Sequence, residues 1–251
     1  MFARMVYAHR GAPVEQPENT LPSFHRAVAL GADAIETDVH MTRDGQVVIA
    51  HDPRALRMAG VDVAWRDIDL DTAKRFDVGW GFVAADGTRP FSGQGIRIPT
   101  LEEALYAFPT MRFNLDLKQR TPSMVAPVLE VLHRHRAEAR VTLASFHATT
   151  LLDVRRRGYG GDTAMAQAEV ALFAAMPLPL WRRLPFTASC AQVPLRAGPL
   201  RFDSRWFIDK CHAAGLRVDF WTINEPAEAT RLYALGADGV MTDDPARVRR
   251  T

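Results

Sequence analysis

Short apolar stretches alternate along the chain with longer segments in which apolar residues recur every three to four positions. A short apolar run between turn residues is typical of a buried strand, and the longer period is typical of an amphipathic helix. We expect strands at 5–8, 33–39, 112–117, 140–145, 162–166, 189–193, 217–222 and 238–242. Strands that alternate with helices predict an α/β fold with a parallel sheet.

A further apolar run, QVVIAH at 46–51, does not fit the alternation. Only six residues separate it from Val39, whereas a crossover between parallel strands needs a dozen or more. The intervening Arg43-Asp44-Gly45 is a turn signal. We therefore expect this run to fold back as a hairpin and to bring His51 to the same rim as the strand ends.

The other runs predict eight parallel strands, and eight strands alternating with helices indicate a (β/α)₈ TIM barrel. An open doubly wound sheet is the alternative, but no G-x-G-x-x-G follows a strand. Residues 53–98 carry mixed charges and the loop sequence DGTRPFSGQG, so we expect them to form an insertion above the barrel rim. Residues 1–251 are then a single domain.

Helix starts are marked by capping residues. Thr20 precedes a helix with Pro22 in its first turn, and Thr100 with Glu103 forms a capping box. In TPSMVAPVLEVLHRHR we expect Thr121 as the cap, with Pro127 bending or delaying the helix.

Composition excludes several classes of protein. The 251 residues include 31 basic and 29 acidic ones, and a net charge of +2 gives no general attraction for nucleic acid. Cys190 and Cys211 match no disulfide framework or metal spacing, so we expect free thiols in a reducing compartment. We find no signal peptide and no uncharged stretch of roughly 20 residues. The sequence predicts a soluble, cytoplasmic protein and does not indicate its oligomeric state.

Polar residues collect where the predicted strands end. In such barrels the active site forms at the carboxyl ends of the strands and in the loops that follow them. The residues expected at this rim are His9, Arg10, Glu36, Asp38, His51, Asp52, Asp116, Lys118, Trp221 and Asp243. Each short motif alone has an ordinary explanation as a turn, a solvated edge or a salt bridge. Their convergence at one rim indicates a functional site.

These residue types suit phosphodiester chemistry. Glu36, Asp38 and Asp116 would offer hard oxygen ligands to Mg²⁺ or Ca²⁺, whereas zinc would draw first on imidazole or thiolate. Arg10 and Lys118 would attract an anionic oxygen substrate such as a phosphate. Histidine has an ordinary pKa near 6.5, so one of His9 and His51 can start neutral and the other protonated. A base, an acid and a dication are what phosphodiester cleavage requires.

At these residues the chain resembles the glycerophosphodiester phosphodiesterases. The shared motifs are AHRGAPVEQPENTLPSF, GADAIETDVHMTRDGQVVIAHD, IPTLEEAL, NLDLK, WTIN and GADGVMTDDP, in the family's order. The resemblance implies a barrel that uses a divalent metal to hydrolyse small glycerophosphodiesters to glycerol 3-phosphate and an alcohol. It implies His9 and His51 as the acid–base pair, Glu36, Asp38 and Asp116 as metal ligands, and Arg10, Lys118, Glu18 and Trp221 as substrate-binding residues.

Three positions need comment. Asp116 stands where the family mostly has Glu, which shortens that arm by one methylene. His40 is in phase with Glu36 and Asp38 but matches no fixed family residue, so we place it beyond the rim without a role. Asn19 suits the cap of the first helix as well as it suits the site.

Two other functions stay open. One is phospholipase D-like cleavage of lysophospholipids on the same barrel. The apolar stretch 170–186, with its paired arginines, can rest weakly on a membrane surface or cradle an acyl chain, although packing against neighbouring elements explains it too. The other is a non-catalytic barrel that binds phosphoesters, which would not need both histidines and all three carboxylates.

Overall fold

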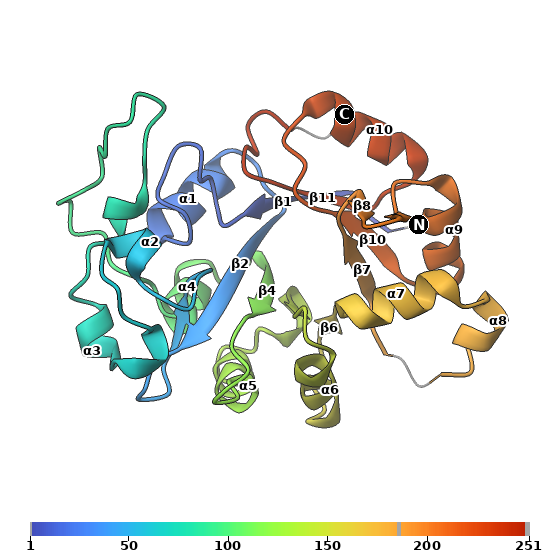
Figure 1. Ribbon diagram of the computed structural model, residues 1–251, viewed down its shortest axis with the longest axis horizontal. Coiled ribbons are helices and arrows are strands. Elements are labelled where there is room, and N and C mark those ends of the chain that lie inside the picture. The colour runs from blue at the N-terminus through green and yellow to red at the C-terminus, as the bar shows by residue number, and fades with distance from the viewer. Residues whose placement is uncertain (1, 185–186, 249–251) are drawn as a thin grey trace.

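The computed structural model describes residues 2–184 and 187–248. Eight parallel strands form a nearly closed barrel in the order β6-β5-β4-β2-β1-β11-β10-β7 (Figure 1). Their bounds are β1 (Met5–His9), β2 (Ala34–Met41), β4 (Arg112–Leu117), β5 (Val141–Ala144), β6 (Asp162–Thr163), β7 (Cys190–Val193), β10 (Arg217–Phe220) and β11 (Gly239–Thr242). A single parallel bridge between Ala164 and Cys190 joins β6 to β7. The predicted barrel is confirmed.

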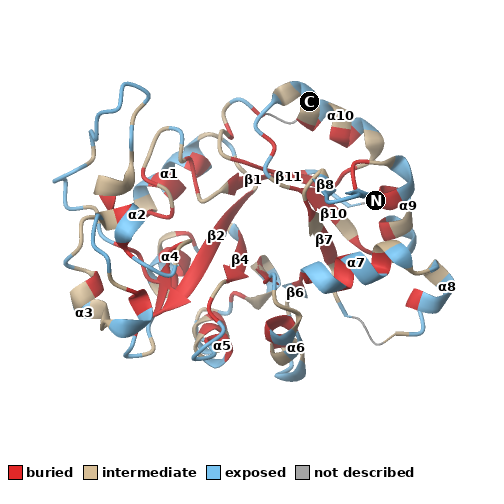
Figure 2. Cartoon of the chain, in the orientation of Figure 1, coloured by how far each residue is buried: buried red, intermediate tan, exposed pale blue. Residues whose placement is uncertain are grey.

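Helices surround the barrel and turn their buried faces toward it (Figure 2). Their bounds are α1 (Leu21–Ala29), α4 (Leu101–Ala107), α5 (Val125–Arg134), α6 (Ala148–Arg156), α7 (Gln167–Ala175), α8 (Leu178–Trp181), α9 (Arg205–Ala213) and α10 (Pro226–Leu235). Thr20 caps α1, and Thr100 with Glu103 forms the expected capping box on α4. The prediction that Thr121 caps α5 is wrong. The helix starts at Val125, because Pro127 has no N–H and fits only in the first turn.

The expected hairpin is present. β3 (Val47–Ile49) pairs antiparallel with the end of β2, with Val39 opposite Ile49, and the chain then returns to His51. The segment that follows contains the short helices α2 (Leu56–Ala59) and α3 (Leu70–Ala73) and two 3₁₀ turns at Trp65–Asp67 and Val78–Gly81. It has a small apolar cluster of its own, built around Trp65, which it shares with Val48 of the hairpin. The insertion is thus packed onto the hairpin that carries His51.

A second, smaller hairpin lies between β7 and α9. It pairs β8 (Arg196–Ala197) with β9 (Leu200–Arg201), and all of residues 196–201 are exposed. No run of alternating residues in the sequence marks it, because both of its strands are only two residues long.

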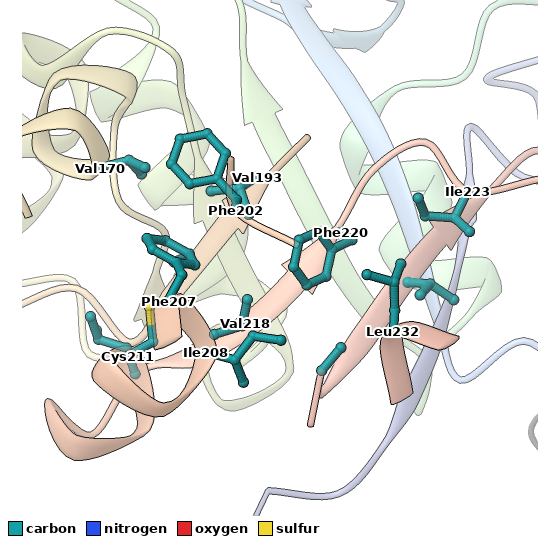
Figure 3. Packing of buried hydrophobic residues seen from close by; sticks show 14 of the residues in the cluster. Val170, Val193, Phe202, Phe207, Ile208, Cys211, Val218, Phe220, Ile223 and Leu232 are labelled. Atoms are coloured by element: carbon teal, nitrogen blue, oxygen red, sulfur yellow. The ribbon is translucent and has the colours of Figure 1, made fainter. Parts of the chain in front are cut away.

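Two large apolar clusters hold the helices to the barrel. One joins β2, β4 and β5 to α1, α4 and α5, and the other joins β7 and β10 to α7, α9 and α10 (Figure 3). Val170, Val193 and Phe202 gather at one end of the second cluster, with Phe207 and Phe220 deeper in it (Figure 3). This end of the cluster also borders the cavity described below.

The interior of the barrel is polar below the site. Arg217 donates to the Tyr7 hydroxyl and to Asp219, each at 2.9 Å, and Tyr7 donates to Asp219 at 3.2 Å. Gly239 leaves room for this network, because a Cβ there would lie 2.3 Å from an oxygen of Asp219. A buried ion pair is tolerated when its partners satisfy each other, as they do here. None of the helices in the described part of the chain is long and apolar enough to cross a membrane.

Candidate active site

The turn after β1 places the first functional side chains. Arg10 has φ of +58°, a left-handed conformation that costs a non-glycine residue free energy, and Gly11 follows at +92°. The backbone is held there by bonds from Arg10 N to the Glu36 carbonyl (2.8 Å) and from Asn19 N to the Arg10 carbonyl (3.0 Å). At Gly11 a Cβ would meet the Ser23 hydroxyl at 2.3 Å, so a side chain is excluded. The local strain directs His9 and Arg10 toward the barrel mouth.

The three predicted carboxylates come from neighbouring strands. Asp38 of β2 stands directly opposite Asp116 of β4, and Glu36 lies two residues earlier on the same face of β2. Lys118 bridges the opposed pair, at 2.9 Å from Asp38 and 2.6 Å from Asp116. Arg10 Nε lies 3.2 Å from Asp38, an ion pair that is not aligned as a hydrogen bond. Asp38 thus contacts both basic side chains that the sequence singled out.

Burial affects the ionisation of these carboxylates differently. Burial and the adjacent charge of Asp38 raise the pKa of Glu36 to about 8. Burial also raises the pKa of Asp116, against the opposing charge of Lys118. Although burial opposes it, the charges of Lys118 and Arg10 lower the pKa of Asp38. Glu36 is therefore the carboxylate whose charge is least compensated by the protein.

Two oxygens at this site have no hydrogen-bond partner although they are buried, Glu36 Oε2 and Asp116 Oδ1. Buried polar atoms are normally satisfied, so unpaired ones indicate a missing partner. Carboxylate oxygens are the donors that Mg²⁺ and Ca²⁺ prefer. In the described residues no group of three or more His, Cys, Asp or Glu side chains is spaced to hold a metal, and Lys118 lies between two of the carboxylates. The donor chemistry and the unpaired oxygens nevertheless fit a dication.

His9 is held from behind by a carboxylate. Its Nδ1 donates to Asp243 at 2.6 Å, and Asp243 also accepts from Asn224 at 2.8 Å. The other ring nitrogen, Nε2, lies 3.8 Å from Glu36. Burial works against the charged imidazole, but the bond to Asp243 and the charge of Glu36 raise the pKa of His9. The pairing with Asp243 leaves Nε2 directed toward the carboxylates.

His51 has the same arrangement on the hairpin. Its Nδ1 donates to Asp52 at 2.7 Å, and Arg57 of α2 donates to the second oxygen of Asp52 at 2.6 Å. Although partial burial opposes it, the bonds from Arg57 and His51 lower the pKa of Asp52 to about 2. His40, which the sequence left without a role, is buried and donates from Nε2 to the His51 carbonyl at 3.1 Å. Both the backbone and the ring of His51 are therefore fixed.

Glu18 and Asn19 have distinct positions. Glu18 forms a bidentate pair with Arg57 (2.7 and 2.9 Å) and accepts from Arg10 at 3.2 Å, so it links the insertion to the rim. Asn19 is fully buried and donates to Asp38 at 3.2 Å, while Thr20 caps the helix. The capping alternative for Asn19 is wrong, because its side chain is used at the site.

These residues face a cavity of about 640 Å³. Its polar half is lined by His9, Arg10, Glu36, Asp38, His51, Asn114, Asp116 and Lys118. Its other half is mainly apolar and is lined by residues of the C-terminal strands and loops, among them Phe146, Met165, Val170, Phe202 and Met241. Trp221 lies on this wall, edge-to-face with Phe146 at 5.9 Å between ring centroids.

Of the nine residues to which the resemblance gave a role, eight line this cavity, and Glu18 lies outside it and contacts Arg10. Sequence reasoning did not identify the roles of Asp52, Asp243 and Arg57. Asp52 lies next to His51 and Asp243 lies at a strand end, and these positions could have indicated their roles. Arg57 carried no signal, because it lies in the irregular insertion. The arrangement offers two oriented imidazoles, two cations and an oxygen-rich pocket, which suits cleavage of an anionic ester.

Comparison with known proteins agrees with this chemistry. Residues 9–247 match the model of the glycerophosphoryl diester phosphodiesterase family. A probable glycerophosphodiester phosphodiesterase 2 of Mycobacterium tuberculosis is 34% identical, over 96% of this chain and 87% of its own length. A human lysophospholipase D is 29% identical, over 96% of this chain and 84% of its own.

Solved structures share the fold. A phosphodiesterase of Oleispira antarctica, solved with the product sn-glycerol-3-phosphate, superposes with a TM-score of 0.79 at 25% identity, covering 98% of this chain and 95% of its own. The family match spans nearly the whole chain. The chain belongs to the glycerophosphoryl diester phosphodiesterase family and is an enzyme of this class.

Proposed function

We propose that this enzyme hydrolyses glycerophosphodiesters to glycerol 3-phosphate and an alcohol, with His9 and His51 as general acid and base and with a divalent metal at the carboxylates. The observation that supports it most is the pair of histidines, each bonded through Nδ1 to an aspartate, at a cavity that also holds Arg10 and Lys118. A histidine fixed in this way presents Nε2 for proton transfer.

Each group of residues at the site has its own role. Arg10 and Lys118 hold the phosphate by charge, and the two imidazoles accept a proton from water and donate one to the departing alcohol oxygen. Asp243 and Asp52 keep each ring in the required tautomer. Glu36, Asp38 and Asp116 would hold Mg²⁺ or Ca²⁺, which when bound supplies positive charge for the phosphoryl oxygens. The glycerol 3-phosphate bound to the Oleispira antarctica relative supports this substrate class.

The test is turnover of glycerophosphocholine by the purified chain, with glycerol 3-phosphate and choline measured separately. We expect both products with added Mg²⁺ or Ca²⁺ and none in excess chelator. Full turnover in the chelator would overturn the metal requirement, and no turnover with any dication would overturn the hydrolysis of this substrate.

The role of Asp116 can be tested separately. Asp116→Ala removes a ligand and leaves Lys118 with one partner, so the metal concentration at half-maximal activity should rise about 10- to 100-fold. Asp116→Glu supplies the family's usual side chain and should retain activity. If Asp116→Ala responds to metal as the parent enzyme does, Asp116 is not a ligand.

A second candidate is the cleavage of lysophospholipids. The observation that favours it is the apolar half of the cavity, which a small headgroup such as choline or ethanolamine does not require. The name of the human relative points the same way. Parallel assays on glycerophosphocholine and lysophosphatidylcholine would separate the two activities. A kcat/KM for the lysophospholipid far below that for glycerophosphocholine would exclude this candidate.

A further inference from the structure

The polar and apolar halves of the cavity meet at two side-chain amides. Gln192 of β7 donates from Nε2 to Oδ1 of Asn114 on β4 at 2.8 Å, and both residues line the cavity. β5 and β6 lie between these two strands in the barrel, so the bond crosses the barrel interior. We call Asn114 and Gln192 the amide pair.

The register of the sheet places the amide pair inside the barrel, beside the carboxylates. Asn114 stands opposite Glu36 and two residues before Asp116, so its side chain points to the same side of the sheet as theirs. Gln192 stands opposite Asp219, whose side chain belongs to the polar network of the interior. Two residues of a strand cover roughly 7 Å, so the amide pair lies that much deeper in the barrel than Asp116.

The amide pair has hydrogen-bonding capacity that the protein does not use. Each amide carries two N–H donors and an oxygen that accepts. Within the described part of the chain, Asn114 Nδ2 and Gln192 Oε1 bond to no other group, and both atoms are accessible from the cavity. Asn114 as a whole is only 2% exposed. A buried residue whose donor opens into a cavity without a partner indicates a ligand there.

We propose that the amide pair binds the hydroxyl groups of the substrate's glycerol. A hydroxyl both accepts and donates, so the two hydroxyls of a glycerol phosphate match one free donor and one free acceptor. A phosphoryl oxygen cannot donate to Gln192 Oε1, and the quaternary ammonium of choline can use neither atom. The inference rests on the proposed function, because that function supplies the glycerol.

The position of the phosphate agrees with this assignment. Arg10 and Lys118 contact Asp38, which stands opposite Asp116, so they hold the phosphate at the level of these two carboxylates. A three-carbon chain spans the roughly 7 Å from there to the amide pair. The glycerol would therefore extend down into the barrel, with its hydroxyls at the amides.

The other explanation for the amide pair is structural. β6 has two residues, and a single bridge joins it to β7, so a bond from β4 to β7 across the same gap can brace the barrel. A brace would act on stability and on every ligand alike. A hydroxyl site would instead distinguish ligands by their hydroxyls.

Calorimetric titration with two ligands tests the proposal without turnover. Glycerol 3-phosphate and propyl phosphate have the same charge and three carbons each, and they differ only in two hydroxyls. With Mg²⁺ present, the parent chain should bind glycerol 3-phosphate more tightly. Gln192→Met gives a side chain of similar length without the amide. It should weaken binding of glycerol 3-phosphate about tenfold and leave propyl phosphate unchanged, since one hydrogen bond contributes about that factor.

A second variant and a control sharpen the test. Asn114→Ala removes the other amide and should have the same selective effect. Gln167 also lines the cavity, at the exposed start of α7, and takes no part in the amide pair. Gln167→Met is therefore the matched control and should change neither affinity. Thermal unfolding of each variant shows whether the barrel is intact.

The proposal is overturned if the parent shows no preference for glycerol 3-phosphate, or if both variants of the amide pair keep the parent's preference. It is also overturned if they weaken both ligands equally and lower Tm, because the pair would then be a brace, or if Gln167→Met has the same selective effect. A chain that loses the preference only in the amide-pair variants but hydrolyses no glycerophosphodiester would contradict the proposed function and leave the hydroxyl site intact.

Discussion

The two halves of the cavity are built in opposite ways. In the polar half, β1, β2, β4 and the β2–β3 hairpin contribute side chains that hold one another through ion pairs, such as Lys118 with Asp38 and Asp116. In the apolar half, β7, α7 and the β8–β9 hairpin contribute packed side chains and loop residues. In the proposed function, the polar half would cleave the phosphodiester and the apolar half would only contact it. We therefore expect that the chemistry and the choice of substrate can be changed separately.

The largest effects should come from the two histidines. A positioned acid or base contributes about 10² to 10⁴ in rate, so His9→Ala and His51→Ala should each lower kcat by that order. A nitrophenol leaving group needs little protonation to depart from the substrate. With it, the histidine that serves as general acid should become nearly dispensable, and the base should stay essential.

Steady-state kinetics on both substrates provide the measurement. Equal losses in both variants on both substrates would contradict the division into acid and base. One histidine would then be better explained as a nucleophile or a phosphate clamp.

Substitution of Arg57 tests whether a residue behind His51 affects the rate of the reaction in the polar half. It orients Asp52, which orients His51, and it also binds Glu18. Arg57→Ala should lower kcat about tenfold with little change in KM, as removal of a residue behind a catalytic one usually does. Guanidinium ion added to Arg57→Ala should restore part of the rate, which would not occur if the residue only stabilised the insertion.

Arg54 is the control for this substitution. It lies on the same insertion and is paired with Asp62, away from the cavity. Arg54→Ala should leave kcat unchanged, and a loss equal to that of Arg57→Ala would show that any perturbed insertion lowers the rate.

A charge in the apolar half should affect only substrate choice. Ala171 is exposed on α7 and lines the cavity mouth, so Ala171→Asp should fold normally. A carboxylate there opposes an acyl chain by about 1 kcal/mol or more, and kcat/KM for lysophosphatidylcholine should fall roughly fivefold. We expect the small glycerophosphocholine to bind without reaching that wall, so its kcat/KM should stay the same. Equal losses on both substrates would show that the two halves are coupled.

The smallest effect concerns stability and pH. Burial and the charge of Asp38 raise the pKa of Glu36 to about 8, whereas an unfolded chain releases that proton near pH 4.3. Between these values the folded chain binds more protons than the unfolded chain, so its stability falls as pH rises. With a chelator present, Glu36→Gln should make stability fall less steeply as pH rises. It should also raise Tm by about 2–4 °C at pH 8.

Calorimetry at pH 5 and pH 8 measures how Tm changes with pH. Glu130→Gln, on an exposed residue of α5, is the control and should leave the slope as it is in the parent. An unchanged slope in Glu36→Gln would show that Glu36 is not the group whose proton is held.

The sequence was most informative about the polar half. Glu36 and Asp38 alternate with apolar residues, so their strand had to turn both carboxylates inward, and the short link after Val39 required a hairpin that returns His51. The partners of the histidines were harder to predict. Asp243 lies 234 residues from His9, and only the closed barrel brings them together.

The sequence singled out the stretch 170–186 and Trp221, and Val170, Ala171 and Trp221 line the apolar half, but the shape of that half was not predictable for a physical reason. Its walls are built partly from α7 and from a hairpin with two-residue strands, and neither has a hydrophobic period that differs from ordinary packing. Cavity shape depends on where loops are placed, which no local pattern specifies. The start of α5 was predicted in part. Thr121 is not the cap, but the delay expected from Pro127 is observed, because the helix starts at Val125.

The two histidines differ in what must unfold to displace them. His9 ends a strand of the barrel itself, while His51 follows a hairpin that packs partly in the barrel cluster, through Val47 and Ile49, and partly in the insertion's cluster around Trp65, through Val48. Local opening of such a unit requires less free energy than global unfolding, and amide hydrogen exchange reports it directly. We therefore expect heat or denaturant that opens the insertion to release Arg57, which orients Asp52 behind His51, while the barrel and its carboxylates remain folded.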